Sequence, residues 1–176
     1  MKNPKVTVDC NEQGGQKVMC WAAVVDGQVF VHWLSPGSTV TGSAYLSLLK
    51  EGFWPQVRRK VRRDGLWFQQ DGATVHTTAT VRQWLAEKFE GRVISRLTER
   101  PWPPRSPDLS PLDCWFWAAA LVELRRHPPA TLQHLQATVE RFAANMDPDD
   151  VRRAVRHLRR RVETCVRRKG GTVENP

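Results

Sequence analysis

The sequence predicts an α/β fold, in which strands and helices alternate ahead of a purely helical carboxy-terminal part. Three observations support this prediction: two apolar runs joined by Asp26-Gly27, a second pair of short apolar runs separated by a helical pattern, and helical patterns alone after Pro111. The 176 residues are 40% hydrophobic and 26% charged, which suits one compact domain of about 100 to 200 residues.

The first element is a predicted β-hairpin. Residues 18–25 form a continuous apolar run typical of a buried strand, and Asp26-Gly27 follows directly. An Asp-Gly pair between apolar runs is a strong hairpin signal, so residues 28–34 are expected to pair antiparallel with the first run. Residues 35–37, Ser-Pro-Gly, end the hairpin.

A strand, a helix and a parallel strand are predicted next. A helix around Tyr45 is expected to bend or break at Gly52 and Pro55. Residues 66–71 form a short strand ending in a carboxylate, and residues 93–97 form its parallel neighbour. Thr77 or Thr78 can cap the helix between them, whose apolar face is Val81, Trp84, Leu85 and Phe89.

The carboxy-terminal part is predicted to be helical. Residues 101–111 are too rich in proline for extended regular structure, and a helix carrying Trp115, Phe116, Leu121 and Leu124 begins near Pro111. Residues 130–144 form a helix that Thr131 can cap. Residues 148–169 place an apolar stripe opposite an arginine face, and Gly170-Gly171 ends that helix.

Composition limits the classes of protein. No apolar run approaches the roughly 18 residues that cross a bilayer, and the amino-terminal residues resemble no signal peptide, so an intracellular, soluble protein without a membrane partner is expected. The four cysteines are scattered, with no Cys-x-x-Cys pair or zinc-ligand spacing. Neither a disulfide framework nor a zinc site is indicated.

Positive charge is concentrated in two segments. The formal net charge is +9, and residues 148–169 hold nine Lys and Arg against three acids. A second cluster spans residues 58–63. Such clusters suit a polyanion like DNA, and a solvated basic helix face is the open alternative. The candidate DNA-contacting residues are Arg58, Arg59, Lys60, Arg62, Arg63, Arg152, Arg156, Arg159 and Arg160.

Two segments contain candidate metal-binding carboxylates. The first segment, Gln69-Gln70-Asp71-Gly72-Ala73-Thr74-Val75-His76, places Asp71 at a strand end. The second, Trp102-Pro103-Pro104-Arg105-Ser106-Pro107-Asp108-Leu109-Ser110-Pro111-Leu112-Asp113, places Asp113 in the first turn of a helix. Carboxylates at such positions can converge on a metal. Magnesium takes one or two protein carboxylates and completes its octahedron with water and phosphate oxygens.

The two segments resemble the signature of mariner-type transposases of the DDE/DDD superfamily. In that family a strand ends in Asp-Asn-Ala or Asp-Gly-Ala with a histidine soon after, and a Ser-Pro-Asp-Leu-x-Pro-x-Asp/Glu block follows. Asp71 matches the second catalytic carboxylate and Asp113 the third, and the 41 residues between them lie among the family's longer spacings. The resemblance runs from about Lys17 to Asn175 and includes Trp21, Gly37, Tyr45, Arg160-Arg161, Cys165 and Gly170-Gly171.

The resemblance implies a ribonuclease-H-like fold, a mixed sheet flanked by helices. It also implies two Mg²⁺ or Mn²⁺ ions held by three carboxylates, with Asp71 and Asp113 as catalytic and metal-binding residues and His76 beside the site. The family's first strand, its first catalytic Asp and its helix-turn-helix have no counterpart in the chain. Residues 1–17 are then a residual inter-strand loop, 18–126 a partial catalytic core and 127–176 carboxy-terminal helices of the same domain.

Structural roles remain open for each candidate. Ser110, Pro111 and Asp113 match a helix capping box, and Asp71 can be a turn residue ahead of Gly72. His76 can pack against the following helix, and Asp108 is assigned to the turn after Pro107. Asp9, on an alternating stretch at residues 5–10, is a weaker substitute for the first acid. The tryptophans, Trp115 and Trp117 above all, are assigned to the core in preference to base stacking.

The predicted function is that of a partial catalytic domain of a nuclear, cut-and-paste DNA transposase. Its partners would be transposon ends and target DNA, with a homodimer possible in the complete protein. Without the first carboxylate and its central strand, the chain is expected to cleave no DNA and to fold marginally. The alternative is a transposon-derived remnant that binds DNA without chemistry.

Overall fold

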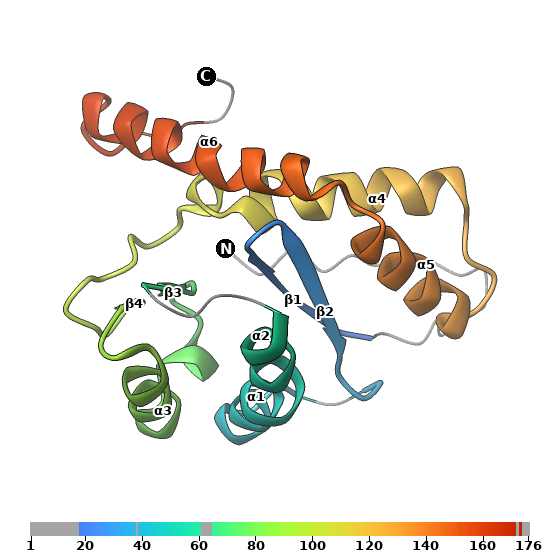
Figure 1. Ribbon diagram of the computed structural model, residues 1–176, viewed down its shortest axis with the longest axis horizontal. Helices are drawn as coiled ribbons and strands as arrows, with labels where there is room; N and C mark the ends of the chain where they lie inside the picture. The colour runs from blue at the N-terminus through green and yellow to red at the C-terminus, as the bar shows by residue number, and fades with distance from the viewer. Residues whose placement is uncertain (1–17, 38, 61–64, 172, 174–176) are drawn as a thin grey trace. The chain divides into compact units, whose positions relative to one another are not determined.

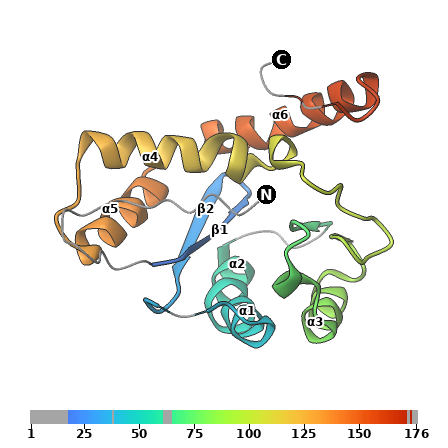
Figure 2. The same cartoon turned by 180° about the vertical axis from the view of Figure 1, so that it is seen from behind.

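The computed structural model describes residues 18–37, 39–60, 65–171 and 173. This part of the chain divides into two compact units (Figures 1 and 2). Of the described residues, one unit contains 18–37 and those from Ser106 onward, and the other contains those between positions 39 and 105. The proposed strand at residues 5–10, with Asp9, lies outside the described residues, as do Arg62 and Arg63.

The first unit begins with the predicted hairpin. Strands β1 (Cys20–Val25) and β2 (Gln28–Trp33) pair antiparallel from Val25↔Gln28 to Cys20↔Trp33. Asp26 and Gly27 have φ angles of 49° and 77°, the left-handed values that a two-residue type I′ turn requires. The turn and the antiparallel pairing predicted from Asp26-Gly27 are therefore both present.

Helices cover one face of this hairpin. A π-helical segment, η4 (Leu112–Phe116), continues into α4 (Trp117–Arg126), and α5 (Leu132–Ala144) follows after Thr131, whose side chain accepts a hydrogen bond from the His134 N–H. Fully buried Phe116 packs with Ala22 and Ala143, and half-buried Trp115 and Trp117 surround them. A neighbouring cluster joins Leu124, Leu135 and Val139 to Trp33 of β2. The two tryptophans are thus part of the core, as predicted.

The last helix, α6 (Pro148–Arg167), is also in this unit (Figure 1). It begins at Asp147, whose carboxylate caps the Asp149 N–H, and has Pro148 at its first position. Its apolar stripe is buried at Val151 but exposed at Val155, Val162 and Val166. The helix ends with Lys169 at φ 52° and with the Gly170 N–H donating to the Cys165 carbonyl at 2.9 Å, a Schellman-type end.

The second unit contains a long helical segment and a small parallel sheet. Helix α1 (Gly42–Ser47), π-helical η1 (Leu48–Phe53) and α2 (Trp54–Lys60) follow one another without a break. The interruption predicted at Gly52 and Pro55 is instead a π-helical turn, in which the Trp54 N–H donates to the Leu49 carbonyl. A wider turn accommodates Pro55, which has no N–H for an α-helical bond.

Strand β3 (Phe68–Gln69), helix α3 (Ala79–Phe89) and strand β4 (Val93–Ile94) form the predicted strand, helix and parallel strand. Val81, Trp84, Leu85 and Phe89 of α3 are buried, as their spacing predicted. Both strands are shorter than expected. The sheet is held by an aromatic core in which the Phe68 and Phe89 ring centroids lie 5.0 Å apart.

Candidate active site

Asp71 lies directly beyond the carboxyl end of β3. The backbone continues the parallel pairing one step past the strand, because the Gln70 N–H donates to the Ile94 carbonyl at 3.1 Å. Asp71 then begins a turn in which its Oδ1 accepts a hydrogen bond from the Ala73 N–H at 3.1 Å. The turn-forming role and the strand-end position proposed from the sequence are therefore both present.

His76 contacts Asp71 directly. Residues Thr74–Thr77 form the 3-10 helix η2, which returns the histidine toward the strand end, and His76 Nδ1 lies 2.6 Å from Asp71 Oδ1. An ionised carboxylate only accepts hydrogen bonds, so Nδ1 is the protonated ring nitrogen in this pair. The hydrogen bond from His76 lowers the pKa of the Asp71 carboxyl, against the opposing effect of burial.

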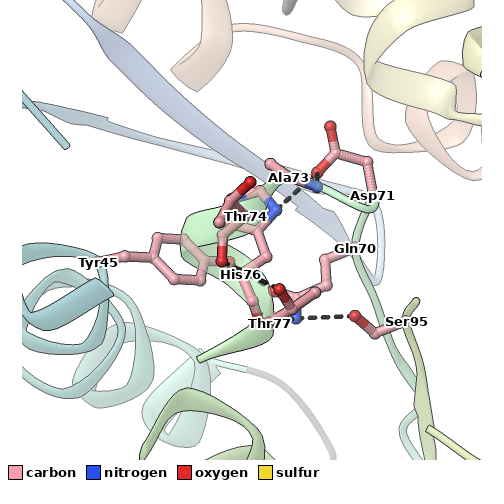
Figure 3. A network of polar contacts seen from close by, with 8 residues as sticks. All are labelled: Tyr45, Gln70, Asp71, Ala73, Thr74, His76, Thr77 and Ser95. Carbon is pink, nitrogen blue, oxygen red and sulfur yellow. Dashed lines mark hydrogen bonds and ion pairs between the residues drawn. The ribbon is translucent and has the colours of Figure 1, made fainter. Parts of the chain in front are cut away.

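The Asp71 carboxylate keeps one oxygen directed away from these donors. Oδ1 receives both hydrogen bonds, and the other oxygen points away from His76 and Ala73 (Figure 3). The Asp71 side chain is 45% exposed, whereas that of His76 is 13% exposed. A partly exposed, ionised carboxylate with one oxygen fixed by donors suits a hard divalent cation at the other oxygen.

Gln70 connects this pair to the rest of the unit. Its side chain is buried and its Oε1 accepts a hydrogen bond from the Tyr45 hydroxyl at 2.9 Å. Its Nε2 donates to the His76 carbonyl at 3.0 Å and to Ser95 Oγ at 3.1 Å (Figure 3). The Tyr45 ring packs on the imidazole with centroids 4.3 Å apart. His76 thus packs on Tyr45 of the preceding helix α1.

The sequence did not single out Gln70 or Ser95. Tyr45 was noted only as part of the resemblance and as an apolar helix position. The available signal was the position of Gln70, a polar residue between a predicted buried strand and a candidate acid. A glutamine buried at such a position needs hydrogen-bond partners for both its side-chain oxygen and its side-chain nitrogen.

Asp113 lies in the other unit, on the π-helical turn η4. Its backbone N–H donates to Ser110 Oγ at 3.4 Å, and the Cys114 N–H donates to the Ser110 carbonyl at 3.0 Å. Ser110 therefore caps the turn as the sequence predicted. The Asp113 side chain is half-buried. Asp71 and Asp113 occupy different units.

Burial makes two of the three described cysteines less reactive. Cys20, Cys114 and Cys165 are free thiols. Burial raises the pKa of the Cys20 thiol to about 12, and burial also raises the pKa of Cys114. Thiolates are the reactive form, so burial makes both thiols less nucleophilic. Among the described residues no group of three or more His, Cys, Asp or Glu side chains is placed to hold a metal ion.

The candidate DNA-contacting arginines that the structure describes are exposed. Arg58 and Arg59 lie on α2, and Arg152, Arg156, Arg159 and Arg160 lie on one face of α6. Arg152 pairs with Asp149 at 2.8 Å and Arg159 with Glu163 at 3.0 Å. No helix within the described ranges is long and apolar enough to span a membrane.

Sequence comparison finds one clear relative. The chain is 25% identical over 162 residues to the Tc3 transposable-element transposase of Caenorhabditis elegans, covering 91% of the chain and 46% of the relative. The chain thus spans about half the length of the curated relative it matches. No protein-family model matches the chain.

Structural comparison finds mariner transposases. The catalytic domain of Mos1 mariner transposase matches with a TM-score of 0.74 at 24% identity, over 90% of this chain and 77% of that one. The Mos1 strand transfer complex matches with a TM-score of 0.79 at 25% identity, over 98% of this chain and 48% of that one. The Mos1 paired-end complex with manganese matches equally well, with a TM-score of 0.79 at 24% identity over 98% of this chain and 52% of that one.

The predicted resemblance and fold class are confirmed. The chain is similar in sequence and in fold to the catalytic region of mariner-type transposases, whose fold is ribonuclease-H-like. Within the described residues the β1–β2 pair is antiparallel and the β3–β4 pair is parallel, and each pair forms a separate two-stranded sheet.

Proposed function

We propose that this chain is the carboxy-terminal part of the catalytic domain of a mariner-type, cut-and-paste DNA transposase. The observation that carries the proposal is the Asp71–His76 pair at the carboxyl end of β3, within a chain whose fold matches the Mos1 catalytic domain. Open α/β sheets bind ligands at the carboxyl ends of their strands.

Asp71 and Asp113 are proposed as metal ligands. Both are partly exposed carboxylates, and Asp71 has an oxygen directed away from its hydrogen-bond donors. Hard oxygen ligands of this kind suit Mg²⁺ or Mn²⁺, and Mos1 structures with each of these metals match this fold. Two ions held with a further carboxylate would lower the pKa of an attacking water or 3′ hydroxyl and neutralise charge at the phosphate.

This chain's own residues have distinct tasks in that site. His76 fixes Oδ1 of Asp71 and keeps the carboxylate ionised, which leaves the other oxygen available to a cation. Ser110 fixes the backbone of the turn that carries Asp113. The exposed arginines of α2 and α6 are proposed to contact the phosphates of transposon ends and target DNA. We also propose a nuclear location and a homodimer for the complete protein.

The decisive experiment is metal-dependent nicking of transposon-end DNA by the protein extended with the upstream part of its reading frame. Asp71→Asn and Asp113→Asn should each abolish nicking with Mg²⁺ and with Mn²⁺, because an amide is a poor ligand for either ion. Asp147→Asn, which changes the exposed cap of α6, should leave nicking intact. Nicking that survives in both site variants would refute the assignment.

The alternative function is DNA binding without cleavage. The exposed arginine face of α6 favours it, because such a face can bind DNA without any metal site. Salt-sensitive DNA binding by an extended protein that fails to nick with either metal would support this alternative. Since only two of the three implied carboxylates match this chain, we expect no cleavage by the 176 residues alone.

A further inference from the structure

Asp108 is a buried carboxylate that the proposed metal site does not use. It lies in the 3-10 helix η3 (Pro107–Leu109), five residues before Asp113, and is 6% exposed. Burying an ionised carboxylate is costly unless hydrogen-bond donors compensate it. Its Oδ2 accepts a hydrogen bond from the Val173 N–H at 2.7 Å.

Arg161 completes this contact from α6. Its Nη1 donates to the Asp108 carbonyl at 3.2 Å and to the Val173 carbonyl at 3.1 Å. The Val173 side chain is fully buried. Three distant parts of the sequence are therefore joined by the Asp108 carboxylate, the Arg161 guanidinium and the backbone of Val173, which we call the Asp108 latch.

The latch adjoins the turn that carries Asp113. Leu109 is buried, and the Leu109 and Ser110 N–H groups donate to the Ser106 and Pro107 carbonyls at 3.2 and 3.0 Å. Ser110 then accepts from the Asp113 N–H. Helix α6 packs against η3, and η3 packs against η4, which carries Asp113.

We propose that Asp108 and Arg161 are positioning residues, which fasten the segment at Val173 against η3 and thereby hold the turn that presents Asp113. The role of Asp113 as a metal ligand rests on the proposed function, whereas the latch itself is a property of the fold. In this proposal Asp108, the aspartate of the Ser-Pro-Asp-Leu segment, stabilises the local backbone and does not bind the metal.

The test compares Asp108→Ala, which removes the acceptor, with Asp108→Asn, which keeps an acceptor oxygen for the Val173 N–H. Hydrogen exchange of the amides at residues 110–116, measured by mass spectrometry, should become about tenfold faster in Asp108→Ala and change little in Asp108→Asn. Asp147→Ala is the matched control, because it removes another carboxylate that accepts a backbone N–H, at the start of α6. It should leave exchange at 110–116 unchanged.

Val173→Pro removes the same hydrogen bond by changing its donor instead of its acceptor. Proline removes the N–H that donates to Asp108, so exchange at 110–116 should again be faster, and this variant decides the matter if Asp108→Ala does not fold. Unchanged exchange in both variants would overturn the latch, as would equal loosening by Asp147→Ala.

Binding of Mn²⁺, followed by the electron paramagnetic resonance signal of the free ion, separates positioning from ligation. A latch predicts that Asp108→Asn binds Mn²⁺ like the unchanged chain and that Asp108→Ala binds it more weakly. Equal loss of Mn²⁺ binding in both variants, with exchange unaltered, would make Asp108 a ligand and overturn the proposal. Mn²⁺ binding is measured on the extended protein used for nicking, and if that protein without substitutions binds no Mn²⁺, the metal assignment fails, whereas the exchange measurement still decides the latch.

Discussion

Gln70 is the residue on which the surroundings of Asp71 depend most. Its side-chain oxygen and nitrogen join Tyr45 of α1, the backbone of His76 and Ser95 beyond β4. Tyr45 and Ser95 are 2% and 1% exposed, so neither hydroxyl has water as a ready substitute partner. A buried network of this kind stabilises the fold only while every member is satisfied.

Gln70→Leu should therefore destabilise the protein by about 3 kcal/mol, since each buried group left without its partner costs about 1 to 3 kcal/mol. The free energy of unfolding from urea titration measures this. Gln83→Leu is the control, because Gln83 donates to Glu87 on the exposed face of α3, and it should change stability by less than about 0.5 kcal/mol. Equal effects of the two substitutions would mean that the Gln70 network contributes nothing beyond surface hydrogen bonding.

The sequence predicted the candidate acids but not what holds them. Asp71 and Asp113 were identified from motif context, and the Ser110 cap from local spacing. The contacts of Gln70 with Tyr45 and Ser95 each span 25 residues, and that of Asp108 with Val173 spans 65. Such pairings depend on the tertiary fold, and local periodicity contains no information about them.

At the scale of elements, the predictions that were confirmed are those that depend only on the local spacing of side chains along a helix. The buried faces of α3 and the cap of α5 were predicted because helical periodicity and capping chemistry are local. The π-helical turns at Leu48–Phe53 and Leu112–Phe116 were missed, because a single wide turn barely alters an apolar pattern. One of these turns carries Asp113.

Two effects favour glycine at position 27 in the β1–β2 turn: the backbone conformation and the lack of space for a side chain. Gly27 has φ 77°, and an added Cβ would lie 3.0 Å from the Pro148 carbonyl oxygen and 3.0 Å from Arg152 Cζ. Gly37 has a similar φ of 73° with nothing within 4 Å. The two glycines therefore separate backbone strain from close packing against α6.

Gly27→Ala should cost about 1 to 2 kcal/mol more stability than Gly37→Ala, because overpacking against a fixed backbone oxygen adds to the strain that both substitutions share. Thermal and urea unfolding of the two variants measure the difference. Equal losses would show that the hairpin end and the start of α6 move apart at little cost.

For the whole molecule, the charge distribution suited either a polyanion such as DNA or a solvated helix face, and it did not predict which arginines are paired with acids. The net charge of +9 is spread over arginines that differ in their surroundings. Arg152 and Arg159 each pair with an acid on α6. Within the described residues, Arg156 and Arg160 on the same face form no ion pair at salt-bridge distance. A guanidinium without an ion-pair partner can bind a phosphate without first breaking a salt bridge.

Replacing Arg156 and Arg160 together by Gln should therefore weaken DNA binding more than replacing Arg152 and Arg159 together, although both changes remove two positive charges. If each unpaired arginine neutralises one phosphate, the slope of log K against log salt should fall by about 1.8 in the first double variant and by less in the second. Fluorescence anisotropy of a labelled duplex across salt concentrations measures both slopes. Equal slopes would mean that net charge alone governs binding. The exposed ion pairs, each worth at most about 1 kcal/mol, would then be replaced by phosphate contacts at no measurable cost.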